Sequence, residues 1–441
     1  MRTVLYRMED YVLYDYAGVE RHLATMAAKG WRLEAAGDYL WKYRRAEPAK
    51  LTYAVTYAPD ASEWNLQPTE RQQMLTDYCT VAGWQKVTDW LQMQIFCTAE
   101  EEPVPLETDE ALRLEITKEA MWSKFLLVQA GSLFLSLVMA AILLLLFVGN
   151  PILYVSKSYL LVWDVLVLYS IFQSGFHLGS YCWWSHRSEQ LVAQGGSCAA
   201  PLPYLLINRI GRIGTAVFLL AFALLILQDK GKGPGLYAVL CMSILFVMIF
   251  LLRKMQRFFK QRGLSKGKNI FALILLDFLL AFLLIGGLRY YALQAGWFTP
   301  QTVTQEELLI TVEDLQEVPG LEYQQQKNTH SSILLTRFYG RQWGEQTTGL
   351  EYEMIEVTWP VLYDWCLQQY LQKHWDTMLF PQPNGYRALK EPIDQLDWAY
   401  QYYDDATPLN QWLLGKGQRI LELKTSWPLT KEQLQLVGEK L

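Results

Sequence analysis

The sequence lacks the residue patterns by which enzymes and metal sites are usually recognised. Its 441 residues include only six cysteines and five histidines. No two cysteines have the short spacing of zinc or redox motifs, and no histidines form a His-Glu-x-x-His pair. The Gly-x-Ser-x-Gly turn that presents a catalytic serine is also absent. We therefore expect no catalytic residue, no metal site and no cofactor, and a protein that is not an enzyme.

The first residues lack the apolar run of a secretory signal peptide. Met1–Asp10 carry charges at Arg2, Arg7, Glu9 and Asp10 and contain no long apolar stretch. Such a segment cannot form the hydrophobic region that export requires. We expect the amino-terminal part to stay in the cytoplasm, with the first export signal near Phe125.

Acidic residues are nearly absent from the middle of the chain. Residues 125–299 hold fourteen Lys and Arg against four Asp and Glu, whereas residues 1–124 and 300–441 are net acidic, at −6 and −9. Nucleic acid is not an expected partner, because phosphate neutralisation needs clustered cations on a binding domain. A basic, apolar middle is better explained by a lipid bilayer with anionic headgroups.

Five apolar runs make this middle an all-α membrane domain. A helix of about 20 apolar residues crosses a bilayer. The runs are Phe125–Val148, Tyr159–Gly179, Ile213–Leu227, Leu236–Leu252 and Ile270–Leu288. The third and fourth lie near the lower length limit, so a re-entrant pair is an alternative for them.

A basic cluster between the fourth and fifth runs orients the chain. It consists of Arg253, Lys254, Arg257, Lys260, Arg262, Lys266 and Lys268. Short loops rich in Lys and Arg remain in the cytoplasm. With this loop inside, five crossings of the plasma membrane leave the N-terminus cytoplasmic and the C-terminus extracytoplasmic.

Residues 1–100 contain an approximate internal repeat. In each copy a helical stretch ends at a Gly-Trp pair, Gly30-Trp31 or Gly83-Trp84, and strand-like runs follow. Both glycines suit the left-handed residue that ends a helix, so these four residues are candidate structural positions. The alternation of Leu91–Ile95 predicts a half-buried strand. The element order predicts a cytoplasmic α+β domain of the ferredoxin-like sandwich type.

Two further segments complete the predicted domain organisation. Residues 101–124 form an acidic linker and the entry into the membrane, and we interpret the acidic, proline-bearing stretch Glu100–Glu110 as a solvated tether. After the membrane domain, residues 300–441 predict an extracytoplasmic α+β domain. Its expected elements are strands at Ser332–Phe338 and Glu351–Trp359, a helix from Val361 and a hairpin through Gly415–Gly417.

Polar residues inside the apolar runs are the remaining candidate functional sites. Asp277 lies near the middle of the fifth run, and Asp164 lies near the outer end of the second. Gln173 and His177 share one face of the second run with Ser170 and Ser174 at helical spacing. The functional interpretation is a proton or ion relay, and the alternative is hydrogen bonding between helices.

The Gly-Trp motifs carry a resemblance to a known family. Met26–Trp31 and Ala82–Trp84, followed by several apolar runs, resemble the bacterial domain-of-unknown-function 2812 family, and Trp412–Glu422 is similar to longer members. The resemblance implies a bacterial membrane protein, frequently encoded beside a PadR-type transcriptional regulator, which makes that regulator a candidate partner. The family has no established catalytic residues, so no site is carried over.

These observations favour a non-enzymatic sensor or regulatory protein. Two folded portions on opposite faces of the membrane would couple an outer domain to a cytoplasmic one in signalling. The alternative is a small transporter, or a transporter accessory subunit, that uses the intramembrane carboxylate of Asp277. An enzyme with an unrecognised site is a third hypothesis.

Overall fold

The chain forms two compact units in the computed structural model. The structure describes residues 3–9, 11–37, 40–62, 67–202, 211–217, 219–220, 234–262, 266–297, 308–316, 323–344, 349–372 and 385–441. The first unit comprises Met1–Met139, Val167–Ala221 and Met242–Gly287. The second comprises Ala140–Leu166, Phe222–Cys241 and Leu288–Leu441. Each unit therefore combines a folded soluble portion with parts of the apolar helices.

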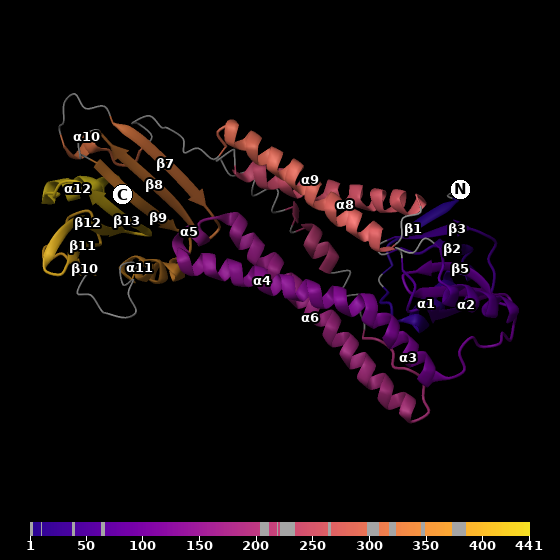
Figure 1. Cartoon of the computed structure of the whole chain (residues 1–441). Helices are drawn as coiled ribbons and strands as arrows, with labels where there is room; N and C mark the ends of the chain where they lie inside the picture. Colours follow the sequence, from indigo (N-terminus) through magenta and orange to yellow (C-terminus); the bar gives the residue numbers. More distant parts are fainter. Residues whose placement is uncertain are drawn as a thin grey trace. The chain divides into compact units, whose positions relative to one another are not determined.

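The amino-terminal portion consists of two successive β-α-β-β motifs (Figure 1). The first motif is β1 (Val4–Arg7), α1 (Tyr16–Ala28), β2 (Trp31–Ala35) and β3 (Trp41–Arg45). The second is β4 (Thr52–Tyr57), α2 (Glu70–Val81), β5 (Gln85–Trp90) and β6 (Met93–Thr98). Each β-α-β-β motif forms its own three-stranded sheet, with the equivalent orders β1-β3-β2 and β4-β6-β5. The repeated sequence pattern thus corresponds to a repeated structural unit.

This pairing corrects the expected ferredoxin-like sandwich, while the coarser α+β class holds. All printed strand pairs of the two small sheets are antiparallel, and no hydrogen-bonded pair among the described strands joins one sheet to the other. A ferredoxin-like fold needs one sheet shared by both halves. The predicted order of helix, three strands, helix and two strands is present from α1 onwards, but the first strand, β1, was not predicted. Strand partners depend on contacts far apart in sequence, which local patterns do not specify.

Both Gly-Trp pairs end their helices as expected. Gly30 and Gly83 adopt positive φ angles of 75° and 84°. At the second pair the Trp84 amide donates to the Cys79 carbonyl at 2.9 Å, and the Gly83 amide donates to the Thr80 carbonyl at 3.1 Å. These two bonds satisfy carbonyl groups that the helix end leaves free. The glycines therefore fix where each helix stops and the next strand starts.

Strand β6 is buried on both faces, which corrects the half-buried strand predicted for residues 91–95. Gln92 is 1% exposed and Gln94 is fully buried. One face of the sheet packs into the core that contains α1, and the other packs against Cys79, Trp84 and the linker residue Leu106. Alternation of apolar and polar residues does not reveal such a second covering layer.

Three described helices are long and apolar enough to cross a membrane. They are α4 (Leu127–Gly149), α6 (Ser158–Ala193) and α9, which runs Lys266–Gln294 with its apolar candidate span at Gly267–Gln294. Most side chains of α4 are exposed, for example Leu145 at 72%. A surface this apolar needs an apolar solvent, which a bilayer supplies.

The third and fourth predicted apolar runs differ from these three candidate spans. Helix α8 (Pro234–Gln261) contains the fourth run and extends through Arg253–Lys260, so part of the basic cluster lies on helix rather than loop. It is not among the three candidate spans of the described residues. The third run, 213–227, lies largely outside the described residues. The second run continues as helix to Ala193, past its predicted end at Gly179.

The carboxyl-terminal portion is built on a seven-stranded antiparallel sheet of order β10-β11-β12-β13-β9-β8-β7. The strands are β7 (Gln324–Ser331), β8 (Leu335–Trp343), β9 (Gly349–Val357), β10 (Gly385–Ala388), β11 (Trp398–Asp404), β12 (Thr407–Lys416) and β13 (Arg419–Thr425). The helices are α10 (Val312–Leu315), η3 (Pro360–Leu362), α11 (Tyr363–Gln372) and α12 (Lys431–Lys440). The predicted hairpin through residues 415–417 is present as β12–β13.

The two faces of this sheet carry different helices. Leu434 and Val437 of α12 pack with Tyr352 and Leu421 in an apolar core. The neighbouring residue on β9, Glu353, points to the other face, where the Tyr370 hydroxyl of α11 donates to its carboxylate at 2.8 Å. Helix α11 thus covers the face opposite α12.

Candidate functional site

The strongest candidate site lies where the amino-terminal portion joins the first apolar helix. Helix α3 (Glu110–Met121) begins at the N-cap Asp109, whose carboxylate accepts from the Ala111 amide at 2.8 Å. It continues through the π-helical segment η1 (Trp122–Leu126) directly into α4. No loop separates the soluble portion from this candidate span, and π-helical turns are frequent at functional sites.

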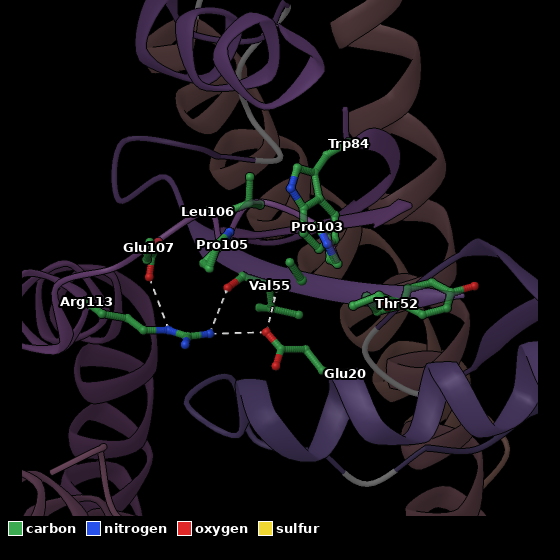
Figure 2. Close-up of a pocket in the computed structure, with 11 residues that line it drawn as sticks. Glu20, Thr52, Val55, Trp84, Pro103, Pro105, Leu106, Glu107 and Arg113 are labelled. Carbon is green, nitrogen blue, oxygen red and sulfur yellow. Dashed lines mark hydrogen bonds and ion pairs between the residues drawn. The ribbon is translucent and has the colours of Figure 1, made fainter. Parts of the chain in front are cut away.

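Arg113, in the first turn of α3, is surrounded by three carboxylates. Its guanidinium lies 3.1 Å from Glu20 and 3.1 Å from Glu107 (Figure 2). Glu110 lies 3.5 Å from the guanidinium. Arg113 also stacks over the Tyr16 ring, 3.7 Å from the ring centroid. The arginine side chain is only 16% exposed. We call Arg113 and these three glutamates the arginine cluster. The planar guanidinium can bind several partners at once, so the cluster joins α1, the linker and α3 at one point.

The same cluster covers the free edge of strand β4. The Val55 amide donates to the Glu20 carboxylate at 2.9 Å, and Arg113 donates to the Val55 carbonyl at 3.4 Å. The Thr56 hydroxyl donates to the Glu107 carboxylate. Because β4 is an edge strand, these main-chain groups have no neighbouring strand to pair with. The Glu20–Arg113 ion pair therefore bonds to the main chain of β4 where a neighbouring strand would otherwise pair.

The linker packs against the domain, contrary to its interpretation as a solvated tether. The Trp84 indole donates to the Val104 carbonyl at 2.9 Å, and Leu106 contacts the core around Cys79. A cavity of ≈ 230 Å³ lies here, and its lining includes Trp84, Pro103, Pro105 and Leu106 as well as Glu20, Glu107 and Arg113 (Figure 2). Ligand pockets usually occupy roughly 300–1,000 Å³, so this cavity suits only a small group.

The charges of the cluster do not balance. Burial raises the pKa of Glu20 and of Glu107 above the usual carboxyl range, although Arg113 opposes the shift in both. The pKa of Arg113 itself is raised by Glu20 despite burial. A permanently charged arginine therefore faces an excess of carboxylates, and the cavity favours a cationic or hydrogen-bond-donating group over an anion. Among the described residues no cluster of His, Cys, Asp and Glu could hold a metal ion.

An aromatic cluster forms a second joint between the amino-terminal portion and the apolar helices. The Tyr14 ring lies 4.8 Å from Trp184, 5.6 Å from Tyr181 and 5.9 Å from Phe125, measured between centroids. Trp184 is fully buried, and its indole donates to the Ala199 carbonyl at 2.8 Å. The loop before α1 is thus packed on η1 and the later part of α6. The clustering of these four aromatic residues was not predicted from the sequence.

The predicted intramembrane candidates do not gather into one site. Ser170 and Ser174 of α6 form hydrogen bonds with hydroxyls of α4, at 2.7 and 3.1 Å. Hydrogen bonding between helices was the alternative interpretation of the polar face that these serines share with Gln173 and His177. His177 is 9% exposed, with its ring 6.2 Å from that of Phe125. Gln173 and Asp277 are exposed on α6 and α9.

Asp164 is separate from that stripe. Its carboxylate accepts from the Tyr154 hydroxyl at 2.7 Å. Tyr154 belongs to the short helix α5 (Pro151–Val155) between α4 and α6. The bond ties the connection between the two helices to the start of α6.

One pair of residues in the arginine cluster is recognisable from sequence spacing alone. Glu110 and Arg113 have the i,i+3 spacing of an ion pair on the first turn of a helix. Glu20 lies 93 residues from its partner Arg113, so nothing local connects them. The linker carboxylates were read as a charge run, and only the folded chain shows that Glu107 turns inward.

The comparison with protein families identifies this region of the chain. The search of curated proteins and the search of solved structures found no match. A family model matches residues 15–129, which include α1, the linker, the arginine cluster and the start of α4. Its description is a protein of unknown function, DUF2812, and the match confirms that residues 15–129 are similar to this family, as the Gly-Trp motifs predicted.

Proposed function

We propose that the protein is a non-enzymatic membrane protein that couples an extracytoplasmic domain to a cytoplasmic regulatory domain. The arginine cluster is the observation that carries the proposal. It binds α1, β4 and the linker to α3, and α3 continues into α4 without a loop. A displacement of α4 is therefore transmitted to the amino-terminal portion through bonded side chains rather than through a flexible tether.

The second unit supports the other end of this coupling. The Phe147 ring near the end of α4 stacks on Trp365 of α11, with centroids 6.3 Å apart and ring planes inclined by 6°. The Ser158 hydroxyl at the start of α6 donates to the Ser331 carbonyl at 2.7 Å. Within that unit, both helices are thus attached to the sheet domain.

An exposed apolar stripe supports a partner for the cytoplasmic domain. Met74, Tyr78 and Val81 lie on one face of α2 and are 71%, 68% and 90% exposed. Exposed apolar stripes of this kind are typical of docking surfaces. The family resemblance makes a PadR-type regulator the first partner to test.

Binding of a PadR-type regulator tests this part of the proposal. The full-length protein should capture the purified regulator, and serine substitutions at Met74, Tyr78 and Val81 should abolish capture. Serine substitutions at Tyr6 on β1 and at Met8 directly after it, which are also exposed, serve as the matched control and should leave capture intact. Equal capture by both variants would exclude the stripe as the docking surface.

The proposed topology has five crossings of a bacterial plasma membrane, with the amino-terminal portion inside. The basic cluster after the fourth run supports it, because such segments resist translocation. A cysteine replacing Glu102 should be protected from an impermeant thiol reagent on intact cells, and a cysteine replacing Thr302 should react. The opposite pattern would mean a reversed orientation, and reaction of both would mean an even number of crossings.

A transporter or transporter accessory subunit is the second candidate. An intramembrane carboxylate is its support, since charges in a bilayer are costly and usually functional. Asp277 is exposed on α9 rather than enclosed by described residues. Transport or resistance phenotypes that persist unchanged in Asp277→Asn would remove this candidate.

A further inference from the structure

Three large apolar side chains are exposed together on the carboxyl-terminal sheet domain. Ile333, in the turn between β7 and β8, is 64% exposed, Trp359 is 55% exposed and Val361 is 84% exposed. The Trp359 indole donates to the Ile333 carbonyl at 2.9 Å, which ties the end of β9 to that turn. We call these three residues the apolar patch.

The apolar patch is attached to the first residue of an apolar helix. Ser331, whose carbonyl accepts from the Ser158 hydroxyl at the start of α6, precedes Ile333 by two residues. Two residues of extended chain span about 7 Å at most, so Ile333 lies close to the end of this candidate span.

The patch is also close to the end of the other helix of the pair. Val361 precedes Trp365 by four residues, and Trp365 stacks on Phe147, two residues before the end of α4. Helices α5 and α11 lie side by side at this point (Figure 1). Both helix ends therefore fix the patch at the level where the candidate spans end.

We propose that the apolar patch of Ile333, Trp359 and Val361 inserts into the lipid headgroup region of the bilayer that α4 and α6 cross. The attachment of the patch beside the ends of α4 and α6, whose apolar side chains are exposed along their length, supports a lipid rather than a protein occupant. Tryptophan is enriched at this depth, because its indole is apolar on one side and polar on the other. Lys157, directly before α6, adds a cation beside the phosphates.

The proposal rests on α4 and α6 crossing a bilayer, and it does not depend on the regulatory role. Its physical consequence is a sheet domain held against the membrane surface instead of swinging freely on its attachments. Insertion of exposed aliphatic side chains contributes to that hold in proportion to the apolar area removed from water.

Depth-dependent quenching of a fluorophore on the full-length protein tests the proposal. Cysteines replace Ile333 or Val361 in a background where the exposed and partly exposed native cysteines are serine, and each is labelled with an environment-sensitive dye. The protein is placed in nanodiscs of phosphatidylcholine and phosphatidylglycerol that carry a nitroxide either on the headgroup or on the acyl chain. Both positions are exposed, so the substitutions leave the sheet core intact.

Leu436→Cys provides the matched control. Leu436 is 44% exposed on α12, which covers the other face of the same sheet. We expect the headgroup nitroxide to quench dyes at 333 and 361 at least about twofold more than the dye at 436. Equal quenching at the three positions would overturn the proposal. A water-shielded dye without lipid quenching would overturn it in favour of a protein contact.

Discussion

Replacement of Arg113 by methionine should loosen strand β4 and the start of α3 together. Methionine keeps the approximate length and the apolar stem of arginine but removes the only cation among Glu20, Glu107 and Glu110. Breaking a fully buried ion pair by removing one partner costs roughly 3–5 kcal/mol. Arg113 is 16% exposed and Glu20 is 24% exposed, so solvent reduces the expected loss to about 2 kcal/mol.

Hydrogen exchange of the full-length protein measures this loss where it occurs. The Val55 amide donates to Glu20, so its exchange reports the opening of the arginine cluster. A loss of about 2 kcal/mol corresponds to roughly 30-fold faster exchange in the segment 52–57. The control is Glu110→Gln, because Glu110 is 32% exposed and 3.5 Å from Arg113, and this change should cost less than about 0.5 kcal/mol.

The reasoning would be refuted by either of two results. Exchange in Arg113→Met that rises less than about threefold over the parent protein would mean that the cluster does not hold β4. Faster exchange that is equal in Arg113→Met and Glu110→Gln would mean that the arginine has no special role. A double-mutant cycle with Glu107→Gln then gives the coupling energy of that pair directly.

Three further predictions concern single residues. Gly83→Ala should destabilise the amino-terminal portion by about 1–2 kcal/mol, since φ is 84° and the new Cβ would lie 2.6 Å from a carboxylate oxygen of Glu100. Gly417→Ala, at φ 58° with open space around it, is the control and should cost less in thermal unfolding. Burial lowers the pKa of His330 from 6.5 to about 4, so its stabilising contribution is present above pH 6.5 and is lost as the pH falls towards 4. His330→Asn should remove that loss in an acid titration of stability. Burial raises the pKa of Glu107, so its stabilising contribution falls as the pH rises above 4.5, and Glu107→Gln should flatten that slope.

Local features of the fold could be predicted from the sequence because their causes are local. The Gly30 and Gly83 helix ends follow from the conformational freedom of glycine next to a helical stretch. Thr430 caps α12 because its side chain accepts from the amide of Gln433, only three residues later, which is again a local cause. The apolar runs of α4, α6 and α9 need only length and composition.

Features that depend on distant partners could not be predicted. Strands β1, β2 and β3 pair among themselves instead of with β4, β5 and β6, and the residue pattern of a strand does not specify its partner strand. Gln94 reads as a solvent-facing residue, yet α2 and the linker cover its side of the sheet. The arginine cluster joins residues from three segments, and only the folded chain brings Glu20 to Arg113.

The side-chain cover on strand β4 makes the assembly state of the protein depend on one charge. If Arg113 is lost, the main-chain groups of Val55 regain the ability to pair with an extended chain from another molecule. Molecules confined to the plane of a membrane meet far more often than the same molecules in solution. Variants of this arginine are therefore expected to self-associate through β4 in a crowded membrane, and cross-linking at raised expression levels would reveal those oligomers.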